Sequence, residues 1–174
     1  LFGLDIGTDA DDLLVRQSCI EKAIASMENQ NAADKARKFI YFSAGIWPNV
    51  EDIHKRQERV ELLKQNILAA QNDTETDTLN RKIIAIGECG LDYYWDKSFI
   101  DIQKTVFKRQ ILLANELDKT LIVHDREAHL DTLMLLKENV SNEIPVVMHC
   151  FSGSYEFGME CIKEGYYLAF GGVS

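Results

Sequence analysis

Residues 83–94 read IIAIGECGLDYY, and this stretch says most about the architecture of the chain. Its first part is a short apolar run rich in isoleucine, without alternating polar residues. Such a run is typical of a strand that is buried on both faces, as the strands of parallel sheets are. The pattern therefore predicts a buried parallel strand over residues 83–90, with a carboxylate, Glu88, near its end.

Similar short apolar runs recur along the chain and predict five further strands, over residues 1–7, 39–46, 120–124, 144–150 and 166–172. The charged stretches between them carry apolar residues at helical spacing, for example Val60, Leu63, Ile67 and Ala70. Spacings of three and four place such residues on one helix face, so these stretches are expected to be crossover helices. The polar segments 29–34 and 71–80 are expected to be loops.

Alternation of strand and helix predicts an α/β fold with a parallel sheet. Two architectures fit. An open doubly wound sheet usually has a glycine-rich phosphate loop after its first strand, and residues 7–10, GTDA, are not one. A TIM-type (β/α)8 barrel needs about 250 residues, so six strands in 174 residues would be only part of one. No domain boundary is apparent, and residues 1–174 are expected to form a single domain.

Composition indicates a folded soluble protein and argues against a membrane protein. Hydrophobic residues make up 46% and charged residues 27%, as in folded soluble proteins. No apolar run reaches the ~20 residues that cross a bilayer, the start does not resemble a signal peptide, and the four cysteines form no CxxC pair. We therefore expect a cytoplasmic protein with free thiols and no membrane partner. A net charge of −9 argues against broad, nonspecific nucleic-acid binding, but it does not exclude a phosphodiester substrate.

Three expected strands carry a metal-ligand type of residue near their ends: Glu88, His124 and His149. Because the carboxyl ends of parallel strands lie along one edge of a sheet, these side chains can converge. One carboxylate and two imidazoles suit zinc, manganese or a similar cation, and two such ions can clamp the oxygens of a phosphodiester. A single strand-end histidine is more often a partly buried structural residue, but three candidate ligands on consecutive strands favour a metal site.

Neighbouring residues allow more than one interpretation each. Arg126 can hold a substrate phosphate, or it can pair on the surface with Asp125 or Glu127. Asp92 is a candidate for substrate binding, and it can also support the residues of the site or simply stabilise a turn. Ser152, with Gly153, can present backbone N–H groups to an anion, although a plain turn is the commoner use of such a pair.

Residues 93–95, YYW, form an aromatic run that can stack on a base or pack over the mouth of a barrel. Cys89 and Cys150 each follow an expected ligand, and alternation along a strand predicts that both point away from it into the core.

The segments IGECGLDYY (86–94), HDREA (124–128) and HCFSG (149–153) together resemble three successive signatures of the TatD family of metal-dependent deoxyribonucleases. The resemblance is strong over residues 83–174 and weaker, but collinear, before them. It implies a TIM barrel of the amidohydrolase superfamily that binds two divalent ions (Mg, Mn or Zn) and hydrolyses DNA, often as a 3′-5′ exonuclease. It also implies that Glu88 bridges the metals, that His124 and His149 are ligands, and that the catalytic residues include Glu88 and Arg126, the latter beside the substrate phosphate.

The sequence departs from the family in three places. The family's first-strand His-x-His pair and eighth-strand Glu-Thr-Asp motif do not occur here, so the six strands are expected to be the second to the seventh of a longer protein. Trp47 and Asn49 occupy positions where many members have histidines, so Trp47 is a candidate for contact with a base or sugar. A related hydrolase of small amides, esters or phosphoesters and a non-catalytic barrel scaffold remain alternatives. The oligomeric state is open, with a monomer expected.

Overall fold

The computed structural model of the protein describes residues 2–48, 53–72 and 82–172. In these residues six parallel strands form one sheet, in the order β1-β2-β3-β4-β5-β6. The strands are β1 (Gly3–Asp5), β2 (Ile40–Ala44), β3 (Ile83–Asp92), β4 (Thr120–Arg126), β5 (Val146–Met148) and β6 (Tyr167–Leu168). Each expected strand is present, although β1, β2, β5 and β6 are shorter than predicted, and β3 and β4 each extend two residues further.

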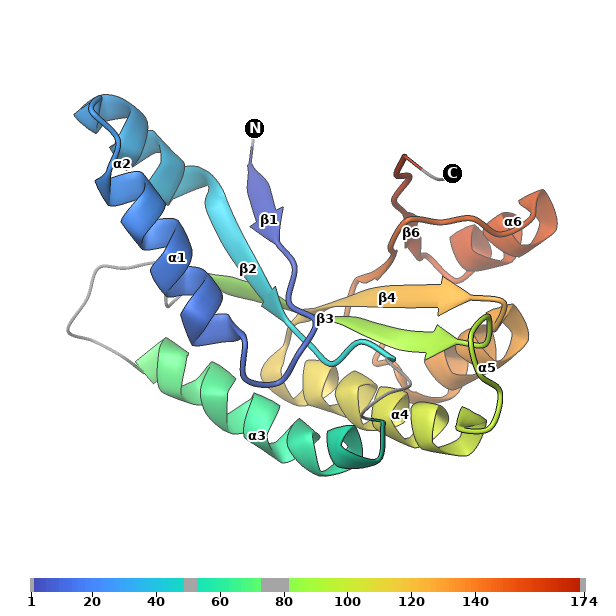
Figure 1. Ribbon diagram of the computed structural model, residues 1–174. Helices are drawn as coiled ribbons and strands as arrows, with labels where there is room; N and C mark the ends of the chain where they lie inside the picture. Colours follow the sequence, from blue (N-terminus) through green and yellow to red (C-terminus); the bar gives the residue numbers. More distant parts are fainter. Residues whose placement is uncertain (1, 49–52, 73–81, 173–174) are drawn as a thin grey trace.

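The described helices are α1 (Leu13–Ala25), α2 (Gln30–Phe39), α3 (Ile53–Asn72), α4 (Ile100–Leu117), α5 (His129–Asn139) and α6 (Tyr155–Lys163). Figure 1 shows α4 beneath β3 and β4 with α3 beside it, and α4 packs directly on β3. The strand order never reverses, which excludes a doubly wound sheet. The strands and helices form a half-barrel, so the predicted partial TIM-type barrel is confirmed.

Burial follows the predicted helical pattern. Leu63 and Ile67 of α3 have no exposed surface, and they join the core beneath the sheet. The prediction of a loop over residues 29–34 is wrong, because α2 begins there. The Asn29 side chain caps this helix by accepting a hydrogen bond from the amide of Ala32 (3.1 Å). Of the expected loop 71–80, residues 73–80 lie outside the described residues.

Strand β3 contains a bulge at Gly87 and Glu88, where it carries the first candidate ligand. Ile86 is in register with Leu121 and Cys89 with Val123, so Gly87 and Glu88 together oppose the single residue between those two on β4. A bulge of this kind bends a strand and re-aims a side chain. Gly87 has a φ of +139°, and a Cβ there would lie 2.4 Å from the carbonyl oxygen of Ile122, so this position requires glycine.

The four cysteines, Cys19, Cys89, Cys150 and Cys161, are free thiols, as expected. Within the described ranges, no helix combines the length and the apolar character needed to cross a membrane.

Candidate metal centre

The three predicted ligands meet at the carboxyl edge of the sheet. Oε1 of Glu88 lies 2.7 Å from Nδ1 of His149 and 3.4 Å from Nδ1 of His124. Glu88 belongs to β3 and His124 to β4, while His149 directly follows β5. The side chain of Glu88 is 13% exposed, so the carboxylate is shielded but still open to the solvent.

The carboxylate of Asp92 binds the ring nitrogen of His124 that faces away from Glu88. Nε2 of His124 lies 3.0 Å from Oδ2 of Asp92, whose side chain is 0% exposed. Gln103 on α4 fixes the backbone of Asp92, because its amide group exchanges two hydrogen bonds of 2.9 Å with the N–H and C=O of Asp92. With no accessible surface, Asp92 is suited to support His124, and its burial does not favour the predicted contact with substrate.

The charges of these groups depend on one another. Burial acts to raise the pKa of Glu88, but hydrogen bonds from His124 and His149 outweigh burial and hold that pKa below its ordinary value. Burial acts to lower the pKa of His124, but Glu88 and Asp92 raise it above its ordinary value. In the metal-free protein, the stabilisation of the fold by these ion pairs is complete at pH values between the ordinary pKa of a glutamate and the ordinary pKa of a histidine. It is lost as the pH falls through the lowered pKa of Glu88 or rises through the raised pKa of His124.

The donor set fits a divalent cation. When Nε2–H of His124 donates to Asp92, the other ring nitrogen, Nδ1, keeps its lone pair, and this nitrogen faces Glu88. Two ligands on one tetrahedral ion, at bonds of about 2.0–2.1 Å, lie about 3.3 Å apart. The 3.4 Å between Nδ1 of His124 and Oε1 of Glu88 matches this spacing.

His149 is closer to Glu88 than two ligands of one ion would be. Its 2.7 Å contact is a hydrogen bond, and a shared ion would need the two groups to separate by about half an ångström. In agreement, no group of three or more His, Cys, Asp or Glu side chains in the described part of the chain is already spaced for a metal.

Two other predicted site residues, Trp47 and Arg126, make aromatic contacts at or near this centre. The ring of Trp47 meets His124 edge to face, with centroids 5.2 Å apart. The guanidinium of Arg126 lies over Tyr94, 3.7 Å from the ring centroid. The surface alternative is not observed, because the described residues include no ion pair of Arg126 with Asp125 or Glu127. Asp125 binds Nδ1 of His129 at 2.6 Å.

The remaining predicted residues are not brought to the centre. Ser152 is exposed and lines an apolar groove of about 410 Å³ along α6. Among the described residues, Ser152 forms no hydrogen bond with any of the three candidate ligands. Asn49 lies outside the described residues.

The sequence predicts that Cys89 and Cys150 both point into the core, and only Cys89 does so. Cys89 is buried in the core, and burial raises the pKa of its thiol. The prediction for Cys150 is wrong, because it is half-buried and its Sγ lies 3.6 Å from Nε2 of His149. Strand β5 ends at Met148 and Cys150 has a φ of +48°, so strand alternation no longer applies there.

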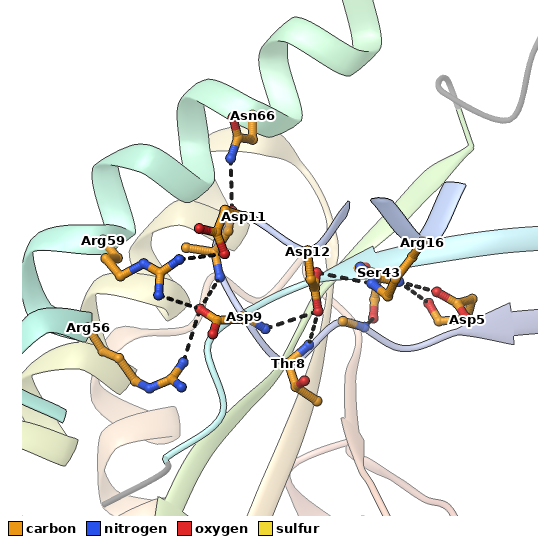
Figure 2. Close-up of polar contacts among 12 residues, drawn as sticks. Asp5, Thr8, Asp9, Asp11, Asp12, Arg16, Ser43, Arg56, Arg59 and Asn66 are labelled. Atoms are coloured by element: carbon orange, nitrogen blue, oxygen red, sulfur yellow. Dashed lines mark hydrogen bonds and ion pairs between the residues drawn. The ribbon is translucent and has the colours of Figure 1, made fainter. Parts of the chain in front are cut away.

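An ion-pair cluster beside the centre was not predicted. Asp9, in the loop between β1 and α1, lies 3.2 Å from Nη1 of Arg56 and 3.0 Å from Nη1 of Arg59, both on α3 (Figure 2). Arg59 also reaches Asp11 at 2.5 Å. The partners are more than forty residues apart in sequence, so no local pattern could have paired them.

This cluster holds the loop whose carbonyl groups reach the centre. The amide of Glu88 donates to the carbonyl of Gly7 (2.7 Å), and the amide of Trp47 donates to that of Thr8 (3.0 Å). Asp12 accepts hydrogen bonds from the amides of Thr8 and Asp9 and tightens the same loop (Figure 2). The loop therefore supports the backbone of a candidate ligand and of the residue that packs on His124.

We expect Asp9→Asn to lower the free energy of unfolding by about 2–3 kcal/mol, because it leaves Arg56, which is only 6% exposed, without this carboxylate. Urea denaturation of the metal-free protein measures the change. The control is Asp34→Asn, which removes a 3.6 Å surface pair with Arg37 and should cost less than about 1 kcal/mol. Equal stabilities for the two variants would contradict this role of Asp9.

We expect Asp92→Asn to weaken manganese binding by about 10- to 100-fold. An asparagine can donate its amide to Nε2 of His124, which would move the ring proton to Nδ1 and remove the lone pair that faces Glu88. Isothermal titration calorimetry measures the affinity. Asp125→Asn is the matched control, because it removes a carboxylate from a histidine outside the three candidate ligands. An unchanged affinity in the Asp92 variant would refute the supporting role.

Comparison with known proteins agrees with the predicted resemblance. The family described as TatD-related DNase matches residues 10–174. The chain is 43% identical over 134 residues to the uncharacterized metal-dependent hydrolase YabD of Bacillus subtilis, covering 77% of this chain and 48% of YabD. It is 30% identical over 147 residues to the 3′-5′ ssDNA/RNA exonuclease TatD of Salmonella typhimurium, covering 83% of this chain and 52% of that protein.

Comparison with solved structures also finds a TatD homologue. The crystal structure of YjjV, a TatD homologue from Escherichia coli, superposes with a TM-score of 0.69 at 23% identity, over 95% of this chain and 54% of YjjV. The chain thus spans about half the length of the proteins it matches. With a family match that extends over nearly all of its residues, the chain belongs to the TatD family.

Proposed function

We propose that this chain forms part of the divalent-metal centre of a hydrolase that cleaves phosphodiester bonds in DNA. The observation that carries the proposal is the Glu88 carboxylate between two imidazoles, one of which is backed by the buried Asp92. The names of the relatives support it, since several are called metal-dependent hydrolases and two are called 3′-5′ ssDNA/RNA exonucleases.

Glu88, His124 and His149 would hold the metal, and we propose two ions of magnesium, manganese or zinc. Bound divalent ions stabilise charge on a phosphate and lower the pKa of water. Glu88 contributes a carboxylate with a lowered pKa, and Asp92 can accept Nε2–H of His124, which leaves the lone pair of Nδ1 to a bound cation. Arg126 supplies N–H donors to a phosphate oxygen, and Trp47 shields one side of His124.

The electrostatics of the centre agree with a need for cations. Glu88 and Asp92 place negative charge where an anionic substrate would sit, and the whole chain has a net charge of −9. A phosphodiester would be repelled from this edge of the sheet without divalent ions to reverse the local field.

The same net charge supports a second candidate, a metal-dependent hydrolase of a small phosphoester, ester or amide. We further propose a cytoplasmic location, since all four cysteines are free thiols. We also propose that residues 1–174 belong to one domain, because the described strands form one sheet, and that the protein is a monomer.

The test is hydrolysis of a single-stranded oligonucleotide by the purified protein. We expect activity with manganese or magnesium, loss of activity in EDTA and recovery when metal is restored. Cleavage that survives chelation would refute the proposal. Metal-dependent turnover of small esters or amides without turnover of DNA would favour the second candidate, and a protein that binds no metal would favour a scaffold.

A further inference from the structure

Two exposed aromatic side chains follow β3 beside the candidate metal centre. Tyr94 is 49% exposed and Trp95 is 65% exposed. Their rings meet edge to face, with centroids 4.8 Å apart. Tyr93 is different, because it is buried and its hydroxyl donates to Asp131 at 2.7 Å. Tyr94 and Trp95 therefore offer open ring surface that the neighbouring Tyr93 does not.

Arg126 adds a positive charge to these rings. Its guanidinium lies 3.7 Å from the ring centroid of Tyr94 and 5.5 Å from that of Trp95. The described residues include no ion pair between Arg126 and a carboxylate, and its neighbour Asp125 is engaged with His129. A stacked guanidinium keeps its N–H edges available for an anion, so the cluster presents flat rings and an available cation together.

The cluster is tied directly to the candidate metal centre. The amide of Tyr94 donates to Oδ1 of Asp92 at 3.0 Å, and the other oxygen of the same carboxylate binds His124. Arg126 is two residues beyond His124 on β4, so both side chains leave the same face of the strand about 7 Å apart. These contacts fix the rings next to the place where a scissile phosphate would bind.

We propose that Tyr94, Trp95 and Arg126 form a stacking platform for an unpaired base of the polynucleotide, adjacent to the phosphodiester that is cleaved. The proposal rests on the proposed function and adds the residues that would hold the strand. Aromatic faces stack on any unpaired base, whereas bases within a duplex already stack on each other. A protein with a net charge of −9 lacks a broad basic surface, so stacking plus one arginine is a suitable way for it to hold a strand.

The first experiment compares an ordinary single-stranded oligonucleotide with an abasic one of equal length, which has the same phosphates but no bases. In the wild-type protein we expect KM for the ordinary strand to be lower by roughly 5- to 150-fold, the range for one stacked base. In the Tyr94→Ala/Trp95→Ala variant we expect the two KM values to coincide. The control, Phe2→Ala, removes another exposed aromatic at the amino end of β1 and should keep the difference.

Equal KM values in the wild-type protein, or a difference that survives in the double variant, would overturn the platform while leaving DNA hydrolysis intact. If neither strand is hydrolysed, the proposed function fails, and fluorescence then decides on the platform. The chain has two tryptophans, so Trp47→Phe leaves Trp95 as the only one. Quenching by the ordinary strand and not by the abasic strand would support stacking. If neither strand quenches the fluorescence of Trp95, the platform is overturned. It is also overturned if a protein partner, and not nucleic acid, saturates the change in Trp95 fluorescence.

Discussion

Replacing Glu88 with glutamine is expected to lower metal-dependent hydrolysis by roughly 10³-fold or more and to abolish tight metal binding. Loss of a group that merely supports a ligand costs about 10- to 100-fold in affinity, and Glu88 is a proposed ligand itself. Glutamine has nearly the same shape but no charge, so it cannot offset the charge of a cation between His124 and His149. Calorimetry with manganese and steady-state kinetics on an oligonucleotide measure the two effects.

The fold should survive this change. Glu88 keeps part of its side chain open to the solvent, and the amide oxygen of glutamine can still accept one hydrogen bond from an imidazole. The thermal unfolding of the metal-free variant is therefore expected to stay cooperative. Glu127→Gln is the matched control, because it neutralises an exposed glutamate at the same edge of the sheet. A Glu88 variant that binds manganese as tightly as this control would exclude the proposed centre.

Replacing Gly90 with alanine is expected to lower the free energy of unfolding by about 3–5 kcal/mol. A Cβ at this position would lie 1.9 Å from the carbonyl oxygen of His124 and 3.0 Å from its amide nitrogen. The φ of Gly90 is +144°, which is unfavourable for any residue with a Cβ, so backbone strain adds about 1–3 kcal/mol to the clash. The structure can relieve the contact only by moving β4, which carries His124.

Urea denaturation measures this effect, and metal affinity of the folded fraction reports the displacement of His124. The control is Gly3→Ala in β1, where no heavy atom lies within 4 Å of the added Cβ, so the change should stay within about 0.5 kcal/mol. A Gly90 variant as stable as the Gly3 variant would show that β3 and β4 are not as close as the structure has them.

The architecture and the three candidate ligands could be predicted because both depend on local pattern. The apolar run before Glu88 fixes a buried strand, and the alternation of strands with helices fixes a parallel sheet. Once the strands are parallel, Glu88, His124 and His149 must lie along one edge, whatever the exact limits of each strand. This is why strand ends that were wrong by several residues did not affect the predicted grouping.

The details of the site could not be predicted in the same way. The bulge at Gly87 and Glu88 depends on the register between β3 and β4, which is a tertiary choice, although glycines inside a strand are a known signal for one. The pairing of Asp9 with Arg56 and Arg59 joins segments that only the folded chain brings together. The loop prediction over residues 29–34 failed because polar composition outweighed a plain capping signal, Asn29 before the helix.

The sequential strand order also bears on how the protein folds. Among the described residues, each strand pairs only with the strands that precede and follow it in the chain, so each of these pairings closes a single crossover. Short loop closures cost less entropy and favour faster folding than distant pairings do. The β3-α4-β4 unit has the most extensive contacts and is therefore a suitable nucleus. The sheet can then grow strand by strand in both directions from this unit.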